Sequence, residues 1–384
     1  MSAPDLLVSQ RLLYLRPQVN LARSTTGRMW IVGICAGLTI VQSAITDSYA
    51  SLFIALAAVA AAGVTEFLIT RKHGLTTLKD GSAIASALVL ALLLPNGINP
   101  VFAALGAVFA MAVVKYSFGG LGANWVNPAL GGWLFVRFSW PAAFTNALES
   151  SHLSVLSRAL AQGFRDTEGS PLGILNANGF DITGTHVLRL LTASSSVSGK
   201  AGAVIQGIGS FEVALMTFLN NTVFAFIGAQ LPGEYVALFM FSGPGIIADR
   251  GVFALLFGTI LLTAFQVIRV WTPLVFVMVY SLLIRLFGGI ALGGAFGSGD
   301  VLFGLCSGGA LAAAFLLAAD PATGPKSRVG SVFIAALAGV FAFLFRYIGL
   351  EPYGAFFAVA LINALVPLVR DWESRGRYRK GGAR

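Results

Sequence analysis

Residues 82–116 read SAIASALVLALLLPNGINPVFAALGAVFAMAVVKY and contain one charged side chain, Lys115. About 20 apolar residues suffice to cross a bilayer as a helix, and Pro and Gly mark the breaks between such helices. The break at Pro95-Asn96-Gly97 therefore divides this stretch into two helical segments. A second stretch with very few charges, 329–369, has the same character. Both stretches predict an all-α polytopic membrane protein.

The composition of the whole chain leads to the same prediction. Of its 384 residues, 57% are hydrophobic and 11% are charged, whereas a soluble domain carries roughly 25% charged residues. This composition excludes a cytosolic enzyme. The net charge of +9 comes from clusters beside the apolar runs, at Arg11–Arg28, Arg71–Lys79 and Arg370–Arg384. Basic residues held at the cytoplasmic face, next to membrane lipid, explain this placement better than a groove for nucleic acid.

The apolar runs predict about ten transmembrane helices in two groups of five. The expected segments are an N-terminal segment 1–28, a first group 29–146, a polar loop 147–210, a second group with a preceding hairpin 211–369, and a basic tail 370–384. Residues 211–248 either form a re-entrant hairpin or cross twice. The expected spans are 29–46, 51–70, 82–96, 99–116, 126–143, 252–269, 271–287, 301–319, 329–347 and 352–369.

The placement of Lys and Arg also predicts the orientation. Basic residues favour the cytoplasmic side, so both termini and the Arg71–Lys79 loop are expected inside, and loop 147–210 outside. An odd number of spans per group inserts two similar halves upside down relative to each other. A faint internal likeness between Ala87–Pro95 and Ala313–Pro321 supports such an inverted repeat. The basic start of the chain is too polar for a signal peptide.

A glycine-rich break, FGGLGANWVNPAL at 118–130, separates the fourth and fifth spans. Gly119, Gly120 and Gly122 let the backbone leave helical geometry, and Asn124 and Asn127 can satisfy the freed backbone groups at membrane depth. This pattern is typical of a broken helix that lines a site, and these five residues are candidate cofactor-binding residues. The alternative is tight helix packing through small residues.

Several of these motifs together resemble one family. The quoted segments are Leu78–Ala83, the 118–130 break, ADPATGP at 319–325, and the closing stretch 346–368. They are similar to the membrane subunit that RnfD of the Rnf complex and NqrB of the sodium-pumping NADH:quinone reductase share, and they are closer to RnfD. The resemblance implies ten helices in two inverted five-helix repeats, a urea-transporter-like architecture, in the bacterial inner membrane.

The resemblance also implies a covalent FMN, joined by a phosphoester to a threonine in the external loop. The nearest match is Asp181-Ile-Thr183-Gly-Thr185, with Thr185 as the expected acceptor and Thr183 or the run Thr192–Ser198 as the fallback. The match is incomplete, because the alanine before the acceptor is missing and a histidine follows it. A neutral hydroxyl needs an activating environment to react, which a separate flavin transferase would supply. The alternative is an unmodified polar turn.

Two further positions are expected near a flavin by this resemblance. Asp249 stands at the glutamate position of a GxIGETS-like motif, and amides around Gly245 at the start of a helix could grip a flavin phosphate. A helix dipole alone also explains a carboxylate at a helix start. Arg346 matches the closing motif and could neutralise an anionic flavin or phosphate. The alternative for Arg346 is an anchor at the membrane interface.

Glu66 is the only carboxylate well within an expected span, so it is the candidate for an ion or proton step. The alternative is a structural pair with Arg71, close to it at the end of the same span. Cys35 and Cys306 lie far apart in apolar runs, without the spacing of a zinc or iron–sulfur site, so no metal site is expected. No residue of this chain is expected to be catalytic by itself.

Three functions remain open at this point. The first is a membrane subunit that passes electrons through FMN and couples them to Na⁺ or H⁺ transport, inactive without Rnf-type or Nqr-type membrane and iron–sulfur subunits. Ferredoxin or flavodoxin and NAD are then the end partners of the complex, and the NqrB branch adds a non-covalent riboflavin. The second is a urea-transporter-like solute channel, since fold alone does not determine function. The third is a structural membrane subunit without flavin.

Overall fold

A computed structural model describes residues 24–46, 49–71, 78–120, 122–144, 221–222, 246–291, 296–297, 299, 301–349 and 351–381. These residues form helices and turns, and no strand occurs among them beyond one isolated bridge between Pro95 and Ile246. The expectation of an all-α protein is confirmed for this part of the chain. The predictions for loop 147–210, for most of 211–248 and for the N-terminal segment up to residue 23 lie outside it.

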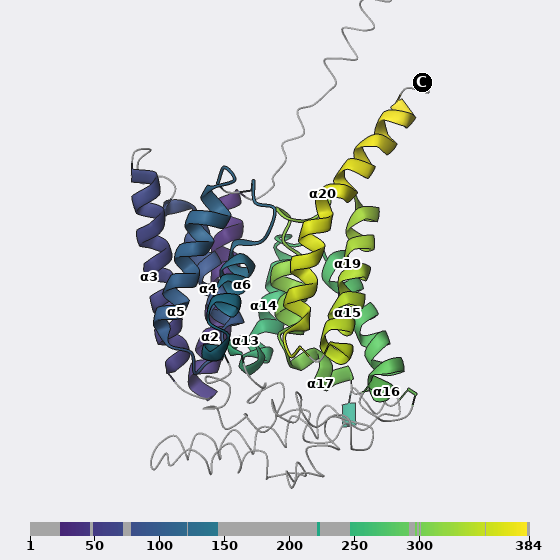
Figure 1. Ribbon diagram of the computed structural model, residues 1–384, viewed down its shortest axis with the longest axis horizontal. Helices are drawn as coiled ribbons and strands as arrows, with labels where there is room; N and C mark the ends of the chain where they lie inside the picture. Colours follow the sequence, from purple (N-terminus) through teal and green to yellow (C-terminus); the bar gives the residue numbers. More distant parts are fainter. Residues whose placement is uncertain are drawn as a thin grey trace, which may run out of the picture.

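The helices of the first half gather on one side of the bundle (Figure 1). They are α2 (Thr25–Thr46), α3 (Ala50–Thr70), the 3₁₀ turn η2 (Leu78–Asp80), α4 (Ser82–Leu93), α5 (Pro100–Phe109), its π-helical continuation η3 (Ala110–Tyr116), and α6 (Pro128–Ser139). Proline at the first position starts both α5 and α6, each behind an asparagine cap. Proline there loses no helical hydrogen bond, so Asn-Pro determines where both helices begin.

The second half lies on the other side of the bundle (Figure 1). Its elements are α13 (Ile247–Arg250), α14 (Val252–Ala264), α15 (Trp271–Leu283), η6 (Ile284–Gly288), α16 (Gly289–Ala291), α17 (Val301–Cys306), α18 (Ala310–Ala312), η7 (Ala313–Ala318), α19 (Arg328–Phe343), η8 (Leu344–Ile348) and α20 (Gly354–Gly381). Here η6, η7 and η8 are π-helical turns that extend the helix before them.

Five helices in the described residues are long and apolar enough to cross a membrane. They are Thr25–Ile45, Ala50–Thr70, Trp271–Ala291, Arg328–Ile348 and Gly354–Arg375. Shorter apolar helices lie at Ser82–Leu93, Pro100–Tyr116 and Val252–Ala264. With 12 residues, α4 rises only about 18 Å, because the chain leaves the helix just before Pro95. It is therefore shorter than the span expected at 82–96.

Small residues let the helices pack closely, and large apolar residues face outward. A Cβ at Gly132 on α6 would lie 2.6 Å from the carbonyl oxygen of Gly106 on α5, so the two backbones touch. Such small-residue contacts are typical of helix association in membranes. On α3, Phe53 and Leu56 are 62% and 64% exposed. An outward apolar face of this kind suits lipid contact.

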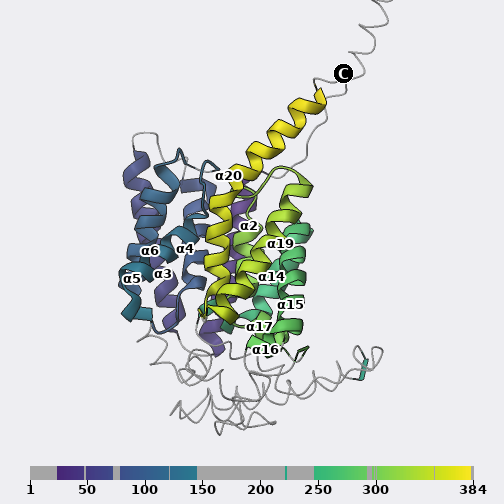
Figure 2. The same cartoon turned by 45° about the vertical axis from the view of Figure 1, so that its right-hand side comes forward.

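The two halves join through helices and through chain breaks. Helix α2 packs against α14, and the amide of Ile247 donates to the carbonyl of Leu94 at 3.0 Å. Helix α20 continues beyond the bundle (Figure 2). At that point Arg370 donates to the carbonyls of Ala322 and Gly324 at 2.9 and 2.7 Å. The end of α4 is therefore held by the second half, and the turn after η7 is held by α20.

Candidate functional site

A cavity of about 470 Å³ lies where the two halves meet. Its lining residues are Thr25, Arg28, Met29 and Val32 of α2, Ser82, Ala85, Ser86 and Val89 of α4, Lys115, Gly122, Asn124, Asn127, Pro128, Leu262, Val267, Ile268, Phe315, Leu316, Asp320, Pro321 and Ala322. The first half contributes most of the polar groups, and the second half contributes apolar side chains and the turn at 320–322. The volume is that of a small-molecule site.

The glycine-rich break forms one wall of this cavity. Gly119, Gly120 and Gly122 have φ values of +105°, +91° and +88°, in the region that residues with a Cβ rarely adopt. The chain can therefore leave η3 and turn back without strain. The side-chain amide of Asn124 faces three backbone carbonyls. In the orientation that directs its nitrogen at these carbonyls, it donates to Val114, Lys115 and Gly120 at 3.2, 3.3 and 3.2 Å. Asn124 thus satisfies backbone groups that the broken helix leaves free.

Asn127 joins the two halves at the edge of the same wall. Its Oδ1 accepts from the amide of Ala129 at 3.0 Å and so caps α6. Its Nδ2 donates to Oδ2 of Asp320 at 2.9 Å, while Oδ1 of Asp320 accepts from the amide of Ala322 at 2.9 Å. One asparagine therefore starts a helix in the first half and holds the cavity turn of the second half.

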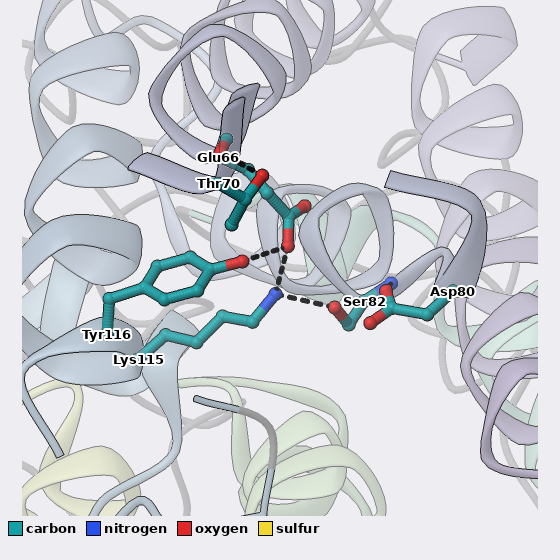
Figure 3. Close-up of polar contacts among 6 residues, drawn as sticks. All are labelled: Glu66, Thr70, Asp80, Ser82, Lys115 and Tyr116. Carbon is teal, nitrogen blue, oxygen red and sulfur yellow. Dashed lines mark hydrogen bonds and ion pairs between the residues drawn. The ribbon is translucent and has the colours of Figure 1, made fainter. Parts of the chain in front are cut away.

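Lys115 is one of three charged residues in the wall, with Arg28 and Asp320, although its side chain is only 2% exposed. Its ammonium donates to Oε1 of Glu66 and to Oγ of Ser82, both at 2.6 Å. The hydroxyl of Tyr116 donates to the same Glu66 oxygen. Figure 3 shows these groups converging from α3, the start of α4 and the end of η3. A buried ion pair is thus completed by two hydroxyl groups.

The Glu66 carboxylate lies behind Lys115 and is not among the groups that line the cavity. Its second oxygen, Oε2, is buried and has no hydrogen-bond partner among the described residues. The alternative pairing with Arg71 is wrong, because the ion pair joins Glu66 to Lys115. The start of α4 is fixed next to this pair, since Oδ1 of Asp80 accepts from the amide of Ser82 at 2.7 Å. Glu66 is therefore connected to the cavity through the side chain of Lys115.

Arg346 occupies a comparable position in the second half, at η8. It donates to the hydroxyl of Tyr280 at 3.1 Å, to the carbonyls of Gly304 and Ser307 at 2.8 and 2.5 Å, and to the Ser307 hydroxyl at 2.5 Å. Its side chain is buried and does not line the cavity. The guanidinium group therefore holds the bend between α17 and α18.

Asp249 lies on the other side of that bend. Its Oδ1 accepts from the amide of Gly309 at 2.9 Å, and Gly309 precedes α18. The carboxylate therefore binds the start of another helix, whereas its own helix, α13, has only four residues and a small dipole. Its Oδ2 is buried without a partner among the described residues. Gly245 lies outside the described residues, and Asp249 does not line the cavity.

The expected flavin acceptor, Thr185, also lies outside the described residues, as do Asp181 and Thr183. In the described part of the chain, no group of three or more metal-ligating side chains occurs, and Cys35 and Cys306 are buried and not joined to each other. Gly119 and Gly120 shape the break without lining the cavity, whereas Gly122, Asn124 and Asn127 line it.

Among the polar cavity groups that sequence reasoning missed are Ser82, Asp320 and the role of Lys115. A signal for each was present, because Lys115 is a lone charge in an apolar run and the other two stand in segments that carry the family resemblance. The partner of Lys115 is 49 residues away and that of Asp320 is 193 residues away. Such long-range pairings leave no local pattern.

The comparisons with known proteins agree with one another. The model of the NQR2, RnfD, RnfE family matches residues 13–379. The D subunit of the proton-translocating ferredoxin:NAD(+) oxidoreductase complex of Clostridium ljungdahlii is 28% identical over 92% of this chain and 91% of its own length. The D subunits of the ion-translocating oxidoreductase complexes of Citrobacter koseri and Escherichia coli are 30% and 32% identical, over 94% and 79% of this chain and 96% and 80% of theirs.

Proposed function

The chain belongs to the NQR2, RnfD, RnfE family, and we propose on this basis that it is the membrane subunit of an ion-translocating electron transport complex. The family match over residues 13–379 carries the proposal. The relatives named as D subunits of such complexes support it, since each aligns along most of its own length. Other subunits of the complex are then its partners, and they carry the nicotinamide and iron–sulfur chemistry.

The first flavin of this subunit is an FMN bound covalently to Thr185. Support comes from the Asp181-Ile-Thr183-Gly-Thr185 motif and from the placement of its loop outside by the charge pattern. A hydroxyl becomes a nucleophile only beside an activating group, so a flavin transferase would be required for attachment. When bound, the flavin supplies one- and two-electron transfer, and the chain supplies its position and surroundings.

The attachment is tested by expressing the full-length chain with a flavin transferase and examining the denaturing gel under ultraviolet light. We expect a fluorescent band that Thr185→Ala abolishes and Thr183→Ala, the matched control, retains. Loss in Thr183→Ala alone would move the attachment to the fallback residue. A dark wild-type band would favour the flavin-free subunit, and solute flux through vesicles that contain this chain alone would favour the channel.

The cavity is the place for a second, non-covalent flavin such as riboflavin. The lining fits this group: apolar side chains of Phe315, Leu316 and Val267 offer faces for a planar ring, and the hydroxyl groups of Ser82 and Ser86 offer a polar edge. The neighbouring asparagines mainly hold the wall, because their amides bind backbone carbonyls and the carboxylate of the cavity turn. If a flavin binds in this cavity, these residues would bind and orient its ring and keep water from it.

Glu66 remains the candidate for the ion step. It is fully buried, it is paired with a lysine of the cavity wall, and one of its oxygens has no partner among the described residues. Buried ionisable groups in spans are costly and mark ion or proton routes. Lys115 would connect any change of charge in the cavity to Glu66, because the same ammonium lines the cavity and binds the carboxylate.

The architecture that we infer has ten helical segments in two inverted repeats of five, urea-transporter-like, with both termini on the cytoplasmic side of the bacterial inner membrane. Two features support the repeat. In each half, a glycine with positive φ comes directly before a helix of the third expected span, which we call the third helix of that half: Gly81 at +72° before α4 and Gly309 at +70° before α18. In each half, the fourth helix also ends in a π-helical turn that carries a buried cation, Lys115 or Arg346.

A further inference from the structure

The Glu66 site contains the oxygen ligands of a cation site with an ammonium group already in place. The Glu66 carboxylate and the Ser82 hydroxyl meet at one point, and the Tyr116 hydroxyl donates to the same carboxylate oxygen from another side (Figure 3). Hard cations such as Na⁺ are bound in proteins by such oxygen ligands. In this chain the Lys115 ammonium occupies that point, at 2.6 Å from both Glu66 Oε1 and Ser82 Oγ.

We propose that Lys115 acts as a built-in cation that keeps Na⁺ from the buried Glu66 carboxylate, so that only a proton exchanges at this centre. The inference rests on the proposed role of Glu66 in the ion step. It goes beyond that role, because it names the kind of ion that the centre accepts and the residue that decides it.

Charge and burial support this exclusion. Glu66 is 0% exposed and Lys115 is 2% exposed, so the carboxylate and the ammonium balance each other in a region of low dielectric. A Na⁺ ion beside Oε1 would lie next to the ammonium, and like charges repel strongly where water cannot screen them. A proton does not need a vacant place beside the ammonium, because it can move along the existing hydrogen bonds of Lys115 and Tyr116 to Glu66.

Among the described residues, Glu66 is the carboxylate that contacts the Lys115 ammonium. The nearby carboxylate of Asp80 is directed at the start of α4 instead, where its Oδ1 accepts from the amide of Ser82. Arg71 is exposed at the end of the helix that carries Glu66, and the ion pair of Glu66 is with Lys115 instead. Thr70 uses its hydroxyl to donate to the Glu66 carbonyl at 2.7 Å. The ammonium therefore fills the place beside the one carboxylate that contacts it, and Na⁺ would have to displace the ammonium.

Thermal unfolding of the purified full-length chain in detergent, in NaCl against KCl at equal ionic strength, tests the proposal. A cation that binds only the folded state raises the melting temperature. For the wild type we expect no difference between the two salts. For Lys115→Met, we expect stabilisation by several degrees in NaCl, because the oxygen ligands then lack their cation. The variant Glu66→Gln/Lys115→Met is the control and should show no difference.

Either of two results overturns the proposal. One is a Na⁺-specific stabilisation of the wild type that Glu66→Gln removes, since Na⁺ would then reach the carboxylate despite Lys115. The other is a Lys115→Met chain that folds and shows no response to Na⁺. If Lys115→Met fails to fold, Lys115→Gln takes its place, because its amide can donate to Glu66. None of these measurements depends on flavin or electron transfer, so they fail separately from the proposed function.

Discussion

The buried cations of the two halves occupy matching places and have different surroundings. Lys115 and Arg346 both lie in the π-helical turn that ends the fourth helix of their half, and both bind the segment at the start of the third. Lys115 is paired with a carboxylate and lines the cavity, whereas Arg346 is bound to hydroxyl and carbonyl groups away from it.

The difference follows from the two side chains. A guanidinium has five donors in a planar fork, which suits several carbonyls of a chain bend, whereas an ammonium is a compact point charge. One architectural position therefore serves as a structural clamp in the second half and as a charged centre in the first. Under the function proposed above, the half with Lys115 would carry the ion step, whereas Arg346 holds a bend of the second half in place.

Removal of the clamp should have the largest effect. Arg346→Met leaves two buried carbonyls and two hydroxyl groups without their donor, and we expect a loss of about 5 kcal/mol in unfolding free energy. Thermal unfolding of the full-length chain in detergent measures it. Arg375→Ala, which breaks an exposed pair with Asp371, is the control and should change little. A small effect of Arg346→Met would contradict the clamp.

The charged centre should show coupling that the clamp lacks. Glu66→Gln or Lys115→Met each leaves one buried charge unpaired and should cost about 3 kcal/mol, whereas the double variant should cost clearly less than the sum. Arg346→Met should not be rescued by Tyr280→Phe, because Tyr280 binds the guanidinium group through a neutral hydroxyl and its removal relieves no unpaired charge. Stability measurements on these variants check this. Additive costs for Glu66 and Lys115 would remove the distinction between the two centres.

The two glycines that precede the third helices, Gly81 and Gly309, should also differ in how much stability a substitution costs, and the larger cost should again fall in the second half. A Cβ at Gly309 would collide with the ring of Phe356 and approach Ile246 to 2.9 Å, whereas one at Gly81 would lie 3.0 Å from the partly exposed Trp30. Both have positive φ, which costs about 1–2 kcal/mol for alanine. We expect Gly309→Ala to cost about 3 kcal/mol and Gly81→Ala about 1–2 kcal/mol. Equal losses in thermal unfolding would count against this packing.

The smallest effect concerns the asparagine that joins the halves. Asn99 and Asn127 cap α5 and α6 in the same way, and of the two it is Asn127 that also binds Asp320. Asn99→Ala should lose about 1 kcal/mol, the value of a cap, and Asn127→Ala about 2 kcal/mol. The difference between the two melting temperatures isolates the contact between the halves. Identical shifts would show that this contact adds no stability.

Much of the fold could be predicted from the sequence, and part of the site could too. Most of the described helices lie within the predicted spans, and five of them are long enough to cross. The differences are that α4 is shorter because Pro95 ends it, that the span expected at 301–319 is interrupted between α17 and α18, and that α20 continues through the expected tail to Gly381. The break at Gly119–Gly122 and the two asparagines were correctly identified as an interruption, since Gly and Asn-Pro are local signals. The alternative that paired Glu66 with Arg71 was wrong. Arg71 is the nearest basic residue in the chain, whereas the actual partner, Lys115, comes from another helix.

By itself the sequence determined the membrane class, the positions of the helices, the expected orientation and the family. These follow from apolar length, from the placement of charges and from motifs, all of which are read along the chain. Only the tertiary structure decided which charges meet, that Asn127 reaches Asp320, and that Lys115 stands between Glu66 and the cavity. The physical reason is that a buried charge is stable only beside a partner, and packing between distant helices chooses that partner.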